Sequence, residues 1–342
     1  MKVEGKKYCF YAGERPKVLL LGNGINRAFD GDSWDKMLDK LKDRERFPME
    51  SKKYLMPMPL KAAMLTQNSL ATKMRGIISK NSSDDSSYSW ANFATANKDL
   101  RDFLSSLFSL GFDYILTTNY SYENEAALLG KESVTENEIR KLQNHTINPK
   151  AQTKFLLNTF NTCISGGKEF QIWHIHGEAR KPDSIIIGHY YYDRLLSRCI
   201  QYLDTTNREF KTSLSEHKPH QVNSWVEAFD WGDVYIIGLG LGFSETDLWW
   251  LLESKRIHKQ GNVFYYTPIP KSSDVCIADG KIECSKTKDF VTEEQCKLEL
   301  MKVTNVSIRD LDFMVGRDGE HKDFYKKVYE DLRKTMASSV SE

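Results

Sequence analysis

The sequence has few of the features that would place it outside ordinary globular proteins. None of its six cysteines forms the closely spaced pair that zinc ribbons and zinc fingers require. No apolar run approaches the roughly 20 residues of a membrane-spanning helix. The lysine-rich start of the chain has no apolar segment of the kind found in signal peptides. We therefore expect a cytoplasmic protein with reduced thiols.

Charge of one sign is not in excess either. The chain has 48 basic and 47 acidic residues, which gives a formal net charge of +1. This balance gives no support for non-specific nucleic-acid binding or for a polybasic membrane-binding surface. With 342 residues, 40% of them hydrophobic, the chain is long enough to bury a large core.

Short, uninterrupted apolar runs recur along the chain, and longer stretches with helical spacing separate them. Strands of this kind are typical of a parallel sheet that helices cover on both faces. The expected strands are Lys17–Leu21, Tyr114–Thr117, Phe170–Ile175, Ser184–Ile187, Val234–Ile237 and Val263–Tyr266. The expected helices are Trp34–Leu41, Ala91–Leu110, Glu136–Lys141, Lys154–Phe160, Tyr191–Leu203, Ser244–Lys259 and Phe324–Met336.

These elements predict one main domain over residues 1–268, with helical insertions at about 45–110 and 125–165. Residues 269–342 are expected to form a C-terminal extension packed on the same core. Within it, Pro268–Phe290 has the composition of a surface insertion or hairpin, and Thr292–Leu311 is expected to hold a helix and a strand.

Two glycine-rich turns each lie between an expected strand and a helix start. The first is the segment from Gly22 to Asn26 (GNGIN), and the second begins at Gly238 (GLGLGFS). Glycines there let backbone N–H groups approach a phosphate, which the positive end of a helix also favours. The alternatives are an ordinary tight turn in the first case and, in the second, a helix start capped by Ser244 and Asp247. An Arg at position 27 interrupts the G-x-G-x-x-G pattern of dinucleotide-binding oxidoreductases.

Polar residues follow two other expected strands. In Thr117–Tyr120 (TTNY), the amide of Asn119 could orient a ribose hydroxyl or a water, or the segment could simply cap the next helix. In the segment WHIHG, alternation along a strand predicts that His174 and His176 point the same way. The pair could hold a metal with His189, but a single imidazole acting as a general base at the strand end is the favoured interpretation.

The order of these motifs resembles that of the SIR2-like NAD-binding family. It is most similar to the bacterial SIR2-like and abortive-infection-H-like proteins of phage defence. The resemblance implies a Rossmann-like fold, with Asn119 and His176 as catalytic residues. It implies that NAD⁺ contacts fall on Gly22, Asn23, Gly24, Ile25, Asn26, Thr118, Tyr120, Gly238, Gly240, Ser244 and Asp247. Many defence relatives have an acid directly after their T-N-Y segment. Here Ser121 stands in that place, so the role of the acid is either missing or supplied by Glu123 or Glu125.

The resemblance further implies an NAD⁺ glycohydrolase, in which NAD⁺ is a substrate and no cofactor or metal is needed. Such an enzyme would deplete NAD⁺ during abortive infection, so a homo-oligomer and a trigger protein are expected partners. The alternatives are an NAD- or ADP-ribose-binding sensor or assembly module, an NAD-dependent deacylase or ADP-ribosyltransferase, and a metal-dependent hydrolase. Deacylation is disfavoured because the chain lacks the four-cysteine zinc module of sirtuins.

Overall fold

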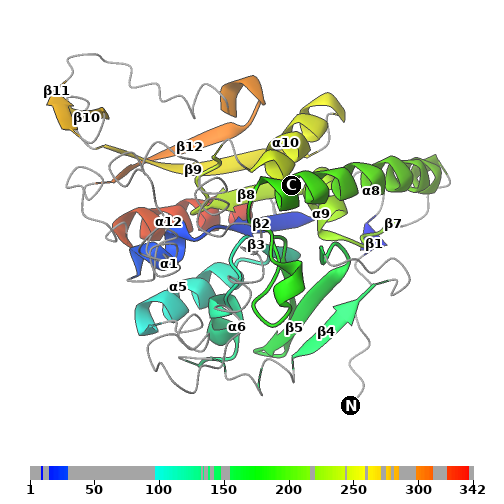
Figure 1. The fold of residues 1–342 in the computed structure, drawn as a ribbon. Helices are drawn as coiled ribbons and strands as arrows, with labels where there is room; N and C mark the ends of the chain where they lie inside the picture. The colour runs from blue at the N-terminus through cyan, green and yellow to red at the C-terminus, as the bar shows by residue number, and fades with distance from the viewer. Residues whose placement is uncertain are drawn as a thin grey trace, which may run out of the picture.

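The core of the protein is a mixed sheet whose strands come from most of the length of the sequence (Figure 1). The computed structural model describes residues 9–10, 15–29, 97–131, 134, 138, 142–147, 155–215, 220–242, 245–258, 261–270, 275–278, 281–284, 298–310 and 322–338. Within these residues, eight strands form the sheet in the order β12-β9-β8-β2-β3-β6-β5-β4. Their bounds in that order are Thr304–Asp310, Val263–Pro270, Asp233–Ile237, Lys17–Leu21, Tyr114–Thr117, Lys168–His174, Thr159–Ser165 and Gln143–Thr146.

The strands from β12 to β6 are parallel, and β5 pairs antiparallel with both β6 and β4. Numbered along the chain, the parallel strands follow the order 3-2-1-4-5-6, the order of dinucleotide-binding Rossmann folds. The chain leaves β2 toward β3 on one side and leaves β8 toward β9 on the other. The topological switch point therefore lies between β2 and β8. The expected α/β, Rossmann-like fold is confirmed.

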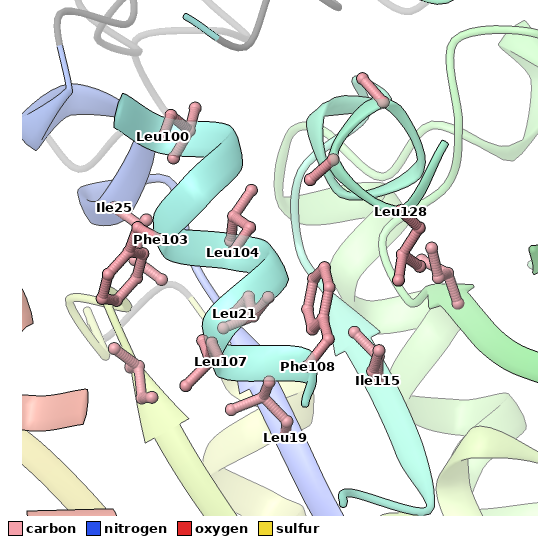
Figure 2. Packing of buried hydrophobic residues seen from close by; sticks show 14 of the residues in the cluster. Leu19, Leu21, Ile25, Leu100, Phe103, Leu104, Leu107, Phe108, Ile115 and Leu128 are labelled. Atoms are coloured by element: carbon pink, nitrogen blue, oxygen red, sulfur yellow. The ribbon is translucent and has the colours of Figure 1, made fainter. Parts of the chain in front are cut away.

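Alternation along the strands divides the core between two layers of helices. Leu19 and Leu21 of β2 pack under α5, α6 and α12, whereas Val18 and Leu20 pack under α8, α9 and α10. Figure 2 shows Leu19 and Leu21 beneath the apolar face of α5. These helices span Lys98–Phe108 (α5), Glu123–Leu128 (α6), Lys322–Ser338 (α12), His189–Ser215 (α8), Trp225–Trp231 (α9) and Thr246–His258 (α10).

Local capping explains where two of these helices begin. The side chain of Asn97 accepts a hydrogen bond from the N–H of Leu100 at 2.9 Å, so α5 begins at Lys98. The side chain of Ser224 accepts one from the N–H of Glu227 at 3.2 Å and fixes the start of α9. A short helix, α1 (Gly24–Ala28), follows β2 directly.

The structure corrects several sequence predictions. The insertion expected to be helical over 125–165 contains α6 but also β4 and β5. The expected helix Lys154–Phe160 is wrong, because a turn at 155–158 leads into β5 at Thr159. Ser184–Ile187 is not a strand, since a 3₁₀ turn, η4 (Pro182–Ser184), ends there. The expected helix Trp34–Leu41 and nearly all of Glu136–Lys141 lie outside the described residues, and α9 was not predicted.

The C-terminal residues contribute to the same sheet. Strand β12 pairs in parallel with β9, and Phe324, Tyr325 and Val328 of α12 belong to the core beneath α5. The expected hairpin is present as β10 (Val275–Ala278) and β11 (Lys281–Cys284). A further pair, β1 (Cys9–Phe10) and β7 (His220–Gln221), lies apart from the main sheet. Across the described helices, none combines the length and the apolar character needed to cross a membrane.

Candidate functional site

The two glycine turns meet at the switch point. The N–H of Gly22 donates to the carbonyl of Ile237 at 2.9 Å, and that of Gly24 donates to Gly238 at 2.7 Å. A Cβ atom at Gly22 would lie 2.3 Å from the carbonyl oxygen of Gly238, whose own φ is +68°. Close packing of two strand ends therefore accounts for these three glycines.

This geometry limits the phosphate contacts that were expected of the first turn. The N–H groups of Gly22 and Gly24 already donate within the protein, so they do not point at a ligand in this conformation. Helix α1 has five residues, and its dipole is correspondingly small. Ile25 and Asn26 are buried, and Asn23 precedes the helix without a side-chain cap.

The second turn differs at Gly240. This residue is exposed, and among the described residues no atom lies within 4 Å of where its Cβ would be. Its φ is not in the positive range that favours glycine. Neither a described packing contact nor a positive φ requires a glycine here, and the absence of a side chain leaves this backbone open to close approach by a ligand. Ser244, the predicted partner further along this turn, lies outside the described residues.

Asn119 lies two residues beyond the end of β3, where neighbouring residues hold the backbone. The N–H of Thr118 donates to Leu21 at 3.1 Å, and that of Asn119 donates to the hydroxyl of Thr117 at 3.1 Å. The Asn119 residue is 4% exposed, and its side-chain oxygen has no hydrogen-bond partner among the described residues. A buried amide oxygen left unpaired costs about 1–3 kcal/mol, so a substrate hydroxyl or a water is the expected partner.

Tyr120 has a partner within the protein. Its hydroxyl donates to the carbonyl of Ile186 at 2.6 Å, and burial together with the charge of Glu245 raises the pKa of the phenol. The carbonyl of Tyr120 accepts from Ala179 at 2.9 Å. In this structure the Tyr120 hydroxyl therefore does not make the expected NAD⁺ contact. It joins the end of β3 to the segment after η4.

His176 forms a buried pair with Asp247. Its Nε2 lies 3.0 Å from Oδ2 of Asp247, and the two residues are 2% and 0% exposed. Burial by itself lowers the pKa of the imidazole, but the charge and hydrogen bond of Asp247 outweigh it, so the pKa is raised overall. The ring of Tyr192 on α8 packs edge-on at 5.3 Å between ring centroids.

The pair fixes the tautomer of the neutral ring. A carboxylate can only accept, so the hydrogen lies on Nε2 and Nδ1 becomes the basic nitrogen. Among the described residues no group hydrogen-bonds Nδ1. Asp247 was expected to contact NAD⁺ or to cap a helix start, and sequence reasoning missed its contact with His176. Its other oxygen, Oδ1, has no partner within the described part of the chain.

His174 does not point the same way as His176, which corrects the sequence prediction. Strand β6 ends at His174, and residues 175 and 176 already belong to a turn that Gly177 closes with a φ of +98°. The turn breaks the alternation of the strand. His174 therefore lies toward α6, whereas His176 reaches α10.

The metal hypothesis loses support from this separation. Both ring nitrogens of His174 are within hydrogen-bond distance of acceptors, Nδ1 at 2.7 Å from the Asn119 carbonyl and Nε2 at 2.8 Å from Oε1 of Glu125. His189 is exposed at the start of α8. Where the structure describes the chain, no three His, Cys, Asp or Glu residues gather to hold a metal ion.

The two candidates for the role of the missing acid, Glu123 and Glu125, make different contacts. The hydroxyl of Ser121 donates to Oε2 of Glu123 at 2.6 Å. Burial raises the pKa of Glu123 to about 7, although the bond from Ser121 lowers it in part. Glu125 instead faces His174. Glu123 is thus the carboxyl group next to Ser121, and burial makes it a weaker acid than an exposed glutamate.

Comparison with protein-family models and with curated proteins finds no match for this chain.

Proposed function

We propose that the protein is an NAD⁺ glycohydrolase, which cleaves the bond between nicotinamide and ribose. The observation that carries the proposal is the buried His176–Asp247 pair. His176 lies on the loop after β6, and Asp247 lies at the start of α10. Strand β6 is the neighbour of β3, whose end leads to Asn119. A base held by a carboxylate and an amide with an unpaired oxygen are groups that a hydrolytic reaction uses.

The fold supports a dinucleotide as the substrate. In open α/β sheets, ligands bind beyond the carboxyl ends of the strands at the switch point, here between β2 and β8. The turn after β8 contains Gly240, which is exposed and needed for no packing contact. The pyrophosphate of NAD⁺ would approach the backbone there. Asp247 follows this turn, so its pair with His176 would join the dinucleotide site to the loop after β6 that carries the base.

In the reaction we propose, the C–N bond to nicotinamide breaks and its electron pair leaves with the neutral base. Positive charge develops on the ribose carbon, as in glycoside hydrolysis, and a water oxygen bonds to that carbon. His176 accepts the proton of that water at Nδ1, and Asp247 stabilises the imidazolium that forms. Asn119 orients the water or a ribose hydroxyl with its side-chain oxygen. The products are nicotinamide, ADP-ribose and a proton.

The test is separation of products after incubation of the purified protein with NAD⁺. We expect nicotinamide and ADP-ribose from the wild type, and loss of both products in Asn119→Ala and His176→Ala. His189→Ala is the matched control, because His189 is an exposed histidine outside the site. Unchanged turnover in both site variants would contradict the residue assignment.

A second candidate is a module that binds NAD⁺ or ADP-ribose without cleaving it. The burial of His176 and Asn119 favours it, because a substrate reaches these side chains only after a movement. Such a module would show thermal stabilisation by NAD⁺ with no product. For the glycohydrolase, the same burial fits an effector of phage defence that a trigger protein or oligomerisation activates, as the family resemblance implies.

A further inference from the structure

His174 forms a second buried cluster that the proposed reaction does not use. Its Nδ1 lies 2.7 Å from the backbone carbonyl of Asn119, and its Nε2 lies 2.8 Å from Oε1 of Glu125. A carbonyl oxygen cannot donate a hydrogen bond, so the hydrogen between His174 and Asn119 belongs to Nδ1. A second proton lies between Nε2 and Glu125, since a lone pair facing a carboxylate would be repelled. The ring therefore donates in both directions.

Other groups around the cluster hold Glu125 in place. The amide nitrogen of Asn161 on β5 donates to Glu125 at 3.0 Å and to Glu178 at 3.2 Å. Glu178 also forms an ion pair with Arg180 and accepts from the hydroxyl of Tyr122, whose ring packs edge-on against His174. Within the described part of the chain, Glu123 and Cys163 are further titratable groups near His174 or Glu125, and Lys181 lies beside Glu178.

The cluster is in direct contact with the backbone of Asn119. Its N–H is bound to the Thr117 hydroxyl on one side, and its carbonyl is bound to His174 on the other. With both peptide groups held, the Cα–Cβ direction of Asn119 is fixed relative to β3 and β6. An amide that must meet a reacting atom depends on such support, because a displacement of about 1 Å can reduce a rate about 100-fold.

We propose that His174 is a positioning residue: its imidazole, held by Glu125, anchors the backbone of Asn119 and thereby sets where the Asn119 amide meets the substrate. This inference rests on the proposed function for its kinetic consequence. Its structural content, the coupling of His174 to the Asn119 side chain, does not depend on NAD⁺ cleavage.

The first part of the test is kinetic. In His174→Gln we expect the kcat for NAD⁺ cleavage to fall about 100-fold with KM nearly unchanged. In the double variant His174→Gln, Glu125→Gln, two amides replace the charged pair and part of the kcat returns. Tyr266→Phe is the control for stability alone, because it removes a buried hydroxyl that donates to Asp331 away from β3 and β6. An unchanged kcat in His174→Gln, or a fall equal to that of Tyr266→Phe, would overturn the proposal.

The second part needs no turnover. In NMR spectra of the full chain, the side-chain amide signals of Asn119 shift in His174→Gln and stay in place in Tyr266→Phe. Asn119 signals that do not move in His174→Gln would overturn the positioning role. If the wild type fails to cleave NAD⁺, the proposed function fails, and the NMR comparison alone decides whether His174 positions Asn119.

Discussion

Nε2 of His176 lies 3.0 Å from Oδ2 of Asp247, although the two residues are 71 positions apart in the chain. The contact joins the loop after β6 to the start of α10, across the ends of β3, β2 and β8. Because Asp247 raises the pKa of His176, it both orients the ring and increases its basicity. The proposed activity depends on this pair.

Asp247→Asn tests the charge of the pair while its shape is kept. We expect kcat for NAD⁺ cleavage to fall about 100-fold or more, since the imidazolium loses its counter-charge. The acid limb of the pH–rate profile should also move to lower pH, because the pKa of His176 falls when the carboxylate is removed. Steady-state kinetics between about pH 5 and 9, a range that brackets the pKa of an ordinary histidine, give both quantities. A limb that stays in place would mean that a group other than His176 is the base.

The His174 cluster predicts a dependence of stability on pH. Burial lowers the pKa of His174, but the charge and hydrogen bond of Glu125, with Glu178 and the Asn119 carbonyl, raise it to about 9. The folded-state pKa is above the unfolded value of about 6.5, so the stabilisation is complete below about pH 6.5 and is lost as the pH rises through 9. The shift corresponds to roughly 3 kcal/mol.

Urea unfolding of the wild type and His174→Gln at several pH values measures this contribution. The difference between the two proteins is the relevant quantity, because Lys255, whose pKa burial lowers to about 7, gives a slope of opposite sign in both. We expect the difference in free energy of unfolding to shrink between about pH 7 and 10, the window set by the raised pKa of His174. A difference that is constant over this window would show that His174 is not protonated in the folded protein.

The glycines of the two turns should respond differently to substitution. Gly22→Ala places a Cβ 2.3 Å from the carbonyl oxygen of Gly238, so we expect a loss of about 1–3 kcal/mol in the free energy of unfolding. Gly240→Ala meets no described atom and should leave stability unchanged or raise it by about 0.4–1 kcal/mol. If Gly240 lies against the dinucleotide, its substitution should still weaken NAD⁺ binding. Calorimetry of unfolding and of NAD⁺ binding separates these effects, and undiminished affinity in Gly240→Ala would place the ligand elsewhere.

Strands β2, β3, β8 and β9 could be predicted because their apolar runs are uninterrupted. In the segment KVLLL the four apolar residues are buried, and the structure gives β2 the predicted bounds. Strand β5 could not be predicted in this way, because Asn161 and Thr162 are polar. Both are buried, and Asn161 is satisfied there because it donates to Glu125 and Glu178, which approach from other elements.

The site itself was only partly predictable. Strand ends and glycine turns identified Asn119, His176 and the switch-point glycines as candidates. The partner of His176 could not be found from spacing, since the contact with Asp247 depends on the order of the strands in the sheet. The opposite directions of His174 and His176 depend on β6 ending between them, and the sequence WHIHG has no signal for that end before Gly177.

The most direct test is the release of nicotinamide from NAD⁺ over time by the wild type, His176→Ala and His189→Ala, with thermal stabilisation by NAD⁺ measured on the same samples. We predict that the wild type and His189→Ala release nicotinamide at equal rates and that His176→Ala releases none while remaining folded. The assignment of this site is contradicted if the wild type shows neither nicotinamide release nor thermal stabilisation by NAD⁺. It is also contradicted if all three proteins release nicotinamide at equal rates.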